Sequence, residues 1–362
     1  MRLLAGRPSA GQPSAGPPVV PGNLLADIRA RSRRRDGRLA LLLLGAVLVV
    51  AAVSLAVGAY SLSVPDLLRS LLGQGTGSEN FIVLKLRLPR LVLAVLAGVA
   101  FAVSGALFQS LLRNPLASPD IIGVTGGASA AAVFAMLVLG VGSVATSLAA
   151  FAGALLVAAA IYLLAWRGGV AGSRFVLIGV GVAFMVDGVL GYLLTRADIR
   201  DAQDALTWLV GSVSGARWPE IAVLAGFLAV LLPVVGMLAG RLRTLQLGDE
   251  AATSLGVSVE RSRLALLVAA VALTAIATAA VGPLAFVAFV SAPIARRLVG
   301  GGGLALLPAA LVGILITTVS DFAAQHLLPG GLELPAGIIT GAIGAPYLLW
   351  LLASTNRQGK GA

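Results

Sequence analysis

Side chains able to do chemistry are scarce in this chain of 362 residues. It has no cysteine and one histidine, His326, which excludes disulfides, thiolate metal sites and multi-histidine zinc or haem sites. Its two lysines, Lys85 and Lys360, stand in no GxxxxGK[ST] loop, so the chain lacks a Walker A nucleotide site. If ATP drives this protein, another subunit must bind the nucleotide.

One carboxylate, Asp187, falls inside a long apolar tract. A charge at the centre of a membrane helix costs about 2.5–3.5 kcal/mol, so Asp187 should face a polar partner or a pathway rather than lipid. Substrate contact or gating and a structural hydrogen bond to another helix both remain open. Asp321 lies nearer the end of its tract, and we expect a structural role for it at a helix end.

The elements that position these residues are membrane helices. Apolar residues make up 58% of the chain and charged residues 11%, and the mean hydropathy is +0.99. A soluble domain carries about 25% charged residues, so a soluble fold is excluded. The tracts are apolar on every face, unlike the alternating strands of a membrane barrel. We predict an all-α membrane protein, a polytopic bundle of about ten transmembrane helices.

Charged residues, and turn signals at Gly140–Ser143 and Gly282-Pro283, divide the apolar sequence. The predicted spans lie near 39–60, 91–112, 121–139, 146–166, 175–195, 221–240, 264–281, 284–299, 304–322 and 337–353. With the N-terminus inside, 19 of the 26 basic residues are cytoplasmic. This asymmetry predicts that both termini are cytoplasmic, in a multi-pass protein of the plasma membrane.

Three regions are expected along the chain: a disordered basic tail (1–38), the helical domain (39–355) and a short cytoplasmic C-terminus (356–362). The tail is rich in Pro, Gly and Ser and then in Arg. Attraction to anionic lipid explains its charge, so no nucleic acid is expected as a partner.

Two outer loops and one inner loop contain further expected elements. In the loop 61–90, Ser63 should cap a short helix, and the loop 196–220 should contain a surface helix. The inner loop 241–263 should form a helix beginning near Asp249, ending at Gly256, and followed by a second short turn capped by Ser258. Such a loop is either a docking element or simply solvated.

Four blocks in order, on a chain with about ten spans, resemble the FecCD family of ABC importer permeases. They are Arg87-Leu-Pro-Arg90 with the following residues 91–130, LGDEAATSLGVSVERSR (247–263), Gly282-Pro-Leu-Ala-Phe-Val, and LELPAGIITGAIGAPYLLWLL (332–352). The resemblance covers roughly residues 40–355, without the tail. It implies a type II ABC importer permease fold and a transport subunit that is not itself an enzyme.

The resemblance also implies partners. These are a second permease chain (a non-identical paralogue or a copy of this one), two ATPase subunits that hold ATP and Mg²⁺, an extracytoplasmic substrate-binding protein and the surrounding membrane lipid. No cofactor is expected on this chain. The implied cargo is a ferric siderophore, moved by alternating access, with cobalamin or haem as alternatives.

The family pattern assigns roles to particular residues. Arg87 and Arg90 resemble contacts for glutamates of the binding protein, the alternative being anchors of a helix end. His326 stands where many members have an arginine. It either replaces that contact or is a plain interfacial residue.

At the other side the pattern implies an ATPase-coupling loop and a cytoplasmic gate. The coupling residues are Leu247, Gly248, Asp249, Glu250, Ala251, Ala252, Ser254, Leu255, Gly256 and Arg261. The gate residues are Asn114, Leu116, Gly172 and Ser173, with a simple turn as the alternative at each place. A rival from another class is a proton-coupled secondary transporter that uses Asp187, against which the coupling loop argues.

Overall fold

The computed structural model describes residues 22–58, 60–166, 172–300, 303–327 and 333–358. Two units are distinguished, Met1–Arg38 and Leu39–Ala362. In the first, helix α1 (Gly22–Ala56) already begins at Gly22, so the expectation of disorder up to residue 38 is wrong from Gly22 on. Residues 1–21 of the expected tail lie outside the described residues. The rest of the description concerns the second unit.

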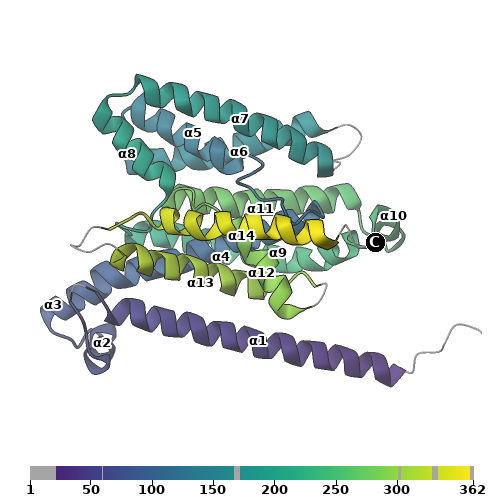
Figure 1. Ribbon diagram of the computed structural model, residues 1–362, viewed down its shortest axis with the longest axis horizontal. Coiled ribbons are helices and arrows are strands. Elements are labelled where there is room, and N and C mark those ends of the chain that lie inside the picture. Colours follow the sequence, from purple (N-terminus) through teal and green to yellow (C-terminus); the bar gives the residue numbers. More distant parts are fainter. Residues whose placement is uncertain (1–21, 59, 167–171, 301–302, 328–332, 359–362) are drawn as a thin grey trace, which may run out of the picture. The chain divides into compact units, whose positions relative to one another are not determined.

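Described residues of the second unit form helices and no strands (Figure 1). After α1 come α2 (Val64–Leu71), α3 (Gly77–Asn80), the π-helix η1 (Phe81–Arg87), α4 (Leu88–Leu111), α5 (Val124–Leu137), α6 (Ser143–Ala165), α7 (Gly172–Arg196) and α8 (Ile199–Val210). The chain continues with α9 (Trp218–Leu245), α10 (Asp249–Ser254), α11 (Val259–Val281), α12 (Val287–Val299), α13 (Leu306–His326) and α14 (Ala336–Gln358).

Eight of the described helices are long and apolar enough to cross a membrane. The other two predicted spans correspond to α5, with 14 residues, and α12, with 13. At 1.5 Å per residue these reach only about 20 Å, against a hydrocarbon core about 30 Å thick. The predicted turns are confirmed, since α6 begins at Ser143 and α11 ends at Val281.

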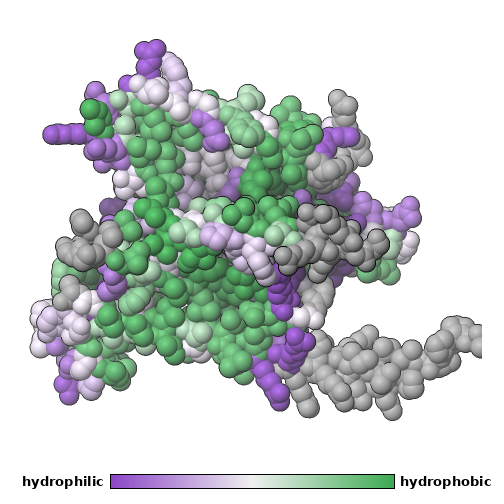
Figure 2. Space-filling view, viewed as in Figure 1, coloured by the Kyte–Doolittle hydropathy of each residue, from purple (hydrophilic) through white to green (hydrophobic). Residues whose placement is uncertain are grey.

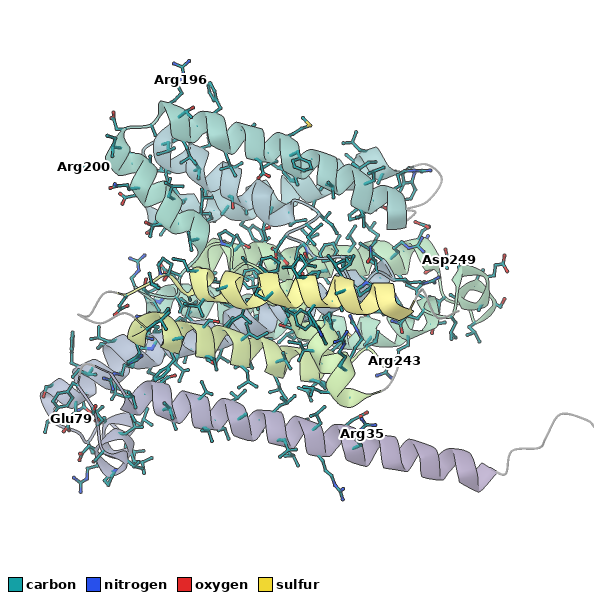
Figure 3. The ribbon with its side chains drawn as sticks, viewed as in Figure 1. Arg35, Glu79, Arg196, Arg200, Arg243 and Asp249 are labelled. Carbon is teal, nitrogen blue, oxygen red and sulfur yellow. The ribbon has the colours of Figure 1, made fainter. Side chains whose placement is uncertain are left out.

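Charged side chains gather at the two ends of the bundle, and apolar side chains lie between them. Glu79, Arg196 and Arg200 lie at one end, which we call the α8 end, and Arg243 and Asp249 at the other, the α10 end (Figure 3). Between the ends, apolar residues cover most of the visible face of the second unit (Figure 2). The helices therefore run between two polar regions, as membrane-spanning helices must.

The core of the bundle is built around α4, which packs against α9, α11, α12 and α13. Small residues bring these backbones together: a Cβ on Gly105 would collide with the carbonyl of Ala288 in α12, and one on Gly98 with Gly313 in α13. Close approach through small residues is typical of membrane helix packing. Buried hydroxyls add interhelical hydrogen bonds, such as Ser104 Oγ to Ala270 O at 2.7 Å.

Helix α7 is the opposite case. In the most apolar 18-residue stretch of α7 only 6% of the residues are buried, against 72% in the corresponding stretches of the helices that contain α4 and α11. It contacts α5 and α6 on one side, and Phe184 and Met185 are each 73% exposed on another. A face this open, on a helix of membrane length, is free for lipid or for another protein chain.

Candidate functional site

The α10 element lies in the loop between α9 and α11. Gly248, with φ of 116°, turns the chain into α10, and Gly256, with φ of 79°, ends it. Ala252 is fully buried beneath the helix, whereas Leu247 and Leu255 are 68% and 65% exposed. The predicted short helix that begins near Asp249 and ends at Gly256 is confirmed. The second short turn at Ser258 is wrong, because Ser258 is the N-cap of the long helix α11.

Ion pairs hold α10 to its neighbours. The guanidinium of Arg263 lies 3.1 Å from the carboxylate of Asp249, and that of Arg113 lies 3.6 Å from it. Arg263 also bonds Glu260 at 3.0 Å, and Arg113 donates to the carbonyl of Leu245. Because Asp249 is the first residue of α10, its pairs link the start of this helix to α11 and to Arg113, two residues after the end of α4.

The outward side of α10 carries the other predicted coupling residues. Glu250, Ser254 and Gly256 are exposed, as is Arg261 at the start of α11. Ala251 is half-buried. Nine of the ten residues therefore lie between Leu247 and Gly256, on or next to α10, and Arg261 lies on α11.

Arg87 is placed at the α8 end, but its side chain is used within the chain. Arg87 is the last residue of η1, which begins at Phe81 and continues without a break into α4 at Leu88. Arg87 donates to the carbonyls of Leu55 at 2.7 Å and Tyr60 at 2.5 Å, so it closes the end of α1 onto α4.

Arg90 lies one turn further along and is the centre of an ionic cluster. It bonds both carboxylate oxygens of Asp321 on α13, at 2.9 and 3.1 Å, and Glu333 at 2.7 Å. Gln325 completes the cluster with a 2.9 Å bond to Asp321. The side chains of Arg90 and Asp321 are only 13% and 8% exposed. The structural role expected for Asp321 thus has a partner 231 residues away, which no local pattern in the sequence indicates.

His326 is the last residue of α13 and is exposed. Its Nδ1 is 2.8 Å from the carbonyl of Phe322, and its ring stacks on Phe322 at 4.3 Å between centroids. Both contacts are within its own helix.

The two predicted gate segments occupy helix boundaries at the α10 end. After α4, the side chain of Asn114 accepts a hydrogen bond from the backbone of Leu116 at 2.9 Å, forming a tight turn. Leu116 packs against the cluster of Phe289, Val290 and Leu351. Gly172 and Ser173 are the first residues of α7, and their side chains lie outside the described residues.

Asp187 lies halfway along α7 and is exposed. In the isolated chain it faces outward from the open side of this helix. The structure therefore does not supply the interhelical hydrogen bond within the chain that was one of its two expected roles.

Asp120 was not singled out from the sequence. It lies between α4 and α5, next to Thr125 and the backbone of Phe286, and one of its oxygens is enclosed without a hydrogen-bond partner. Burial raises the pKa of the Asp120 carboxyl from 3.8 to about 6, although Thr125 and the Phe286 backbone act in the opposite direction. A lone aspartate in a loop gives no sequence signal of such burial.

No described group of histidine or acidic residues could hold a metal ion. Long apolar helices, one of them with an open apolar face, and an exposed short helix at one polar end are the features of a polytopic membrane transport permease. Residues 45–354 match the FecCD transport family, and the chain belongs to that family.

The similarity extends over most of the chain. It is 39% identical to the ferric enterobactin transport system permease protein FepG of Escherichia coli K12, over 88% of this chain and 96% of that protein. It is 44% identical to the achromobactin transport system permease protein CbrC of Dickeya dadantii, over 87% and 91%. Among solved structures, an inward-facing conformation of a protein titled a metal-chelate type ABC transporter matches with a TM-score of 0.76 and 26% identity. That match covers 88% of this chain and 99% of the other.

Proposed function

We propose that this chain is the permease subunit of an ATP-binding-cassette importer that moves a ferric siderophore across the cytoplasmic membrane. The observation that carries the proposal is α10, an exposed short helix with ion pairs to its neighbours, on a chain with no Walker A lysine. The relatives support the cargo, since FepG and CbrC are the permeases of ferric enterobactin and achromobactin transport systems.

The α10 element is where a partner ATPase would act on this chain. Leu247 and Leu255 offer apolar contacts that a protein groove can cover, and Glu250 and Arg261 offer charges at their rim. Because Asp249 is paired with both Arg113 and Arg263, a movement of α10 would act on the segment after α4 and on α11. ATP and Mg²⁺ belong to that partner, and two such ATPases would serve a pair of permeases.

The α10 end is then cytoplasmic, in agreement with the excess of basic residues there and in the tail. Both termini are assigned to the same side. The α8 end faces outward, where an extracytoplasmic binding protein would dock.

Docking at the α8 end involves Arg87, Arg90 and His326 unequally. Arg90 is held by Asp321 and Glu333 and Arg87 by two carbonyls, so a docking protein would meet them already satisfied. We therefore propose that Arg87 and Arg90 mainly stabilise the α8 end of the bundle through these contacts. Their effect on the docking of a binding protein would be partly indirect. His326 is the most accessible of the three.

The pathway would lie along the open face of α7. A second permease chain, either a paralogue or a copy of this one, would cover that face and leave Asp187 in a polar channel between the two. The segments at Asn114, Leu116, Gly172 and Ser173 border its cytoplasmic end and serve as the gate. Alternating access would open and close this end as the ATPases close and separate.

The test substitutes Gly256 by valine in the reconstituted importer, with its ATPase and binding protein. The positive φ of Gly256 is disfavoured for a β-branched residue, so the variant should shift the end of α10. We expect ATP hydrolysis to continue while uptake of the ferric siderophore falls about tenfold or more. Gly240 is the matched control, because it has equal free space around it but lies in an ordinary helix.

Two results would contradict the proposal. If hydrolysis and uptake stayed coupled in Gly256→Val, α10 would not be the element that couples the ATPase to transport. Uptake that survives loss of the ATPase, and instead follows the proton gradient and requires Asp187, would favour a secondary transporter. Uptake of cobalamin or haem in place of a ferric siderophore would leave the architecture and change the cargo.

A further inference from the structure

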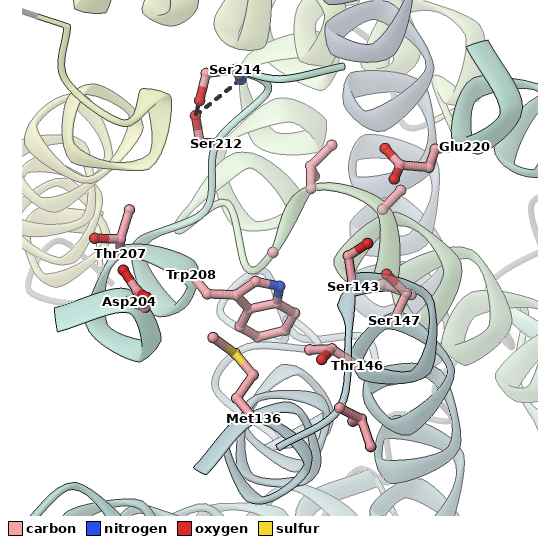
Figure 4. Close-up of a pocket in the computed structure, with 15 residues that line it drawn as sticks. Met136, Ser143, Thr146, Ser147, Asp204, Thr207, Trp208, Ser212, Ser214 and Glu220 are labelled. Atoms are coloured by element: carbon pink, nitrogen blue, oxygen red, sulfur yellow. Dashed lines mark hydrogen bonds between the residues drawn. The ribbon is translucent and has the colours of Figure 1, made fainter. Parts of the chain in front are cut away.

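A cavity of about 430 Å³ opens at the α8 end, away from α7 and α10. It is lined by the turn between α5 and α6, by α8, by the segment after α8 and by the ends of α9 and α11. Figure 4 shows the indole of Trp208 pointing into the space, with Asp204 and Thr207 from the same helix and the hydroxyls of Ser143 and Ser147 from α6. Nothing in the transport cycle described above uses this cavity.

The charge of the cavity is negative. Glu220 is bonded to Arg217, which also donates to the hydroxyl of Ser143 at 3.1 Å, so this carboxylate is neutralised. Asp204 is exposed, and among the described residues no basic side chain pairs with it. One uncompensated carboxylate beside an indole and several hydroxyls is complementary to an ammonium group.

Beside the cavity lies an apolar groove of about 320 Å³. Ser147, Glu220, Ala279 and Ala280 line both spaces, so the two are direct neighbours. The groove lies between α6 and α9, on α11, and its walls include Leu148, Phe151, Val223 and Phe227.

The groove has a direction. It follows α9 from Pro219 to Phe227, which is from the polar α8 end into the apolar part of the span. At 1.5 Å per residue this is about 12 Å of depth. A polar chamber at the polar end of the bundle, beside an apolar groove that runs along a membrane-length helix, matches the amphipathic shape of one lipid molecule.

We propose that the cavity and the groove together bind one membrane phospholipid with a primary-ammonium headgroup, such as phosphatidylethanolamine. The ammonium lies between Asp204 and Trp208, Arg217 is within reach of the phosphate, and an acyl chain occupies the groove between α6 and α9. An anionic headgroup without an ammonium is disfavoured, because Asp204 would face it unpaired.

The headgroup is tested by native mass spectrometry of the full chain in mild detergent, titrated with phosphatidylethanolamine or phosphatidylglycerol of identical acyl chains. We expect the ethanolamine lipid to bind about tenfold more tightly, the ratio given by one charged hydrogen bond. Asp204→Asn should abolish the preference. Asp201→Asn is the matched control, because Asp201 is an exposed aspartate of the same helix outside the cavity.

The groove is tested separately with Val223→Trp, which should fill it and weaken binding of the ethanolamine lipid. Val230→Trp is its control, since Val230 is a similarly exposed residue of α9 outside the groove. Equal binding of the two lipids, no effect of Asp204→Asn, or equal effects of the two tryptophan variants would overturn the proposal. If Asp204→Asn weakened attachment of the binding protein and not of lipid, the cavity would be a protein contact instead.

Discussion

The cluster formed by Arg90, Asp321 and Glu333 gives a prediction whose size follows from burial. Arg90 donates from its Nε to both carboxylate oxygens of Asp321, and less than 15% of either side chain is exposed, so solvent screening is weak. Removing one partner of such a pair leaves the other charge desolvated, which destabilises by about 3–5 kcal/mol. Glu333 still neutralises Arg90 in Asp321→Asn, so we expect about 3 kcal/mol for that variant and the upper end for Arg90→Gln.

A double-mutant cycle separates the pair from the general effect of substitution. The variants Asp321→Asn, Arg90→Gln and the combination would be unfolded by SDS in mixed micelles. If the ion pair is the cause, the double variant loses about 2 kcal/mol less than the sum of the single losses, because neither charge is left alone. Arg69→Gln is the control: its pair with Asp66 is exposed at 67% and 37%, and such pairs contribute under about 1 kcal/mol.

The reasoning would be refuted if both single variants unfolded within about 1 kcal/mol of the parent, or if their effects simply added. A charge reversal at Arg90 is a poor probe of binding-protein docking for the same reason. It would place three carboxylates together at the mouth of the bundle, and a loss of uptake would report damage to the fold.

Two further predictions concern other parts of the bundle. Gly105→Ala should lower the thermal unfolding temperature by many degrees, because the added methyl group would meet the Ala288 carbonyl. Gly240→Ala, which has open space around it, should not lower it. Equal unfolding temperatures of the two variants would contradict the close approach of α4 and α12. For Asp120, the folded pKa of about 6 lies above the unfolded value of 3.8, so the folded state holds the proton longer and stability falls as pH rises from about 4 to 6. The loss of folding free energy is about 3 kcal/mol at most, and it is complete once the pH is above the folded pKa. Asp120→Asn should remove this slope and unfold at a higher temperature than the parent at pH 7.5, and an unchanged slope would assign the pH dependence to another group.

The sequence predicted what depends on local signals. Gly140–Ser143 and Gly282-Pro283 mark turns by composition, and the helices break there. Ser63 caps α2 through a bond from the backbone of Asp66, as its position before Val-Pro-Asp predicts. The acidic residues at Asp249 and the glycine at position 256 predicted the short helix α10, which lies between two long helices.

Other features depend on residues far apart in the chain. Arg87 and Arg90 were interpreted as docking contacts or as anchors of a helix end, and the motif alone does not indicate the partners that their side chains have within the chain. The carboxyl of Asp120 is bonded by the backbone of Phe286, which follows it by more than 160 residues. A single sequence carries no signal for such pairings, because each residue type by itself is ordinary in its position.

The open face of α7 has a consequence for biogenesis. A chain released alone into the bilayer presents Asp187 to lipid, which adds about 2.5–3.5 kcal/mol to its free energy until the face is covered. The second permease proposed above would cover this face and remove the cost, so each subunit would be more stable in the assembled pair than alone.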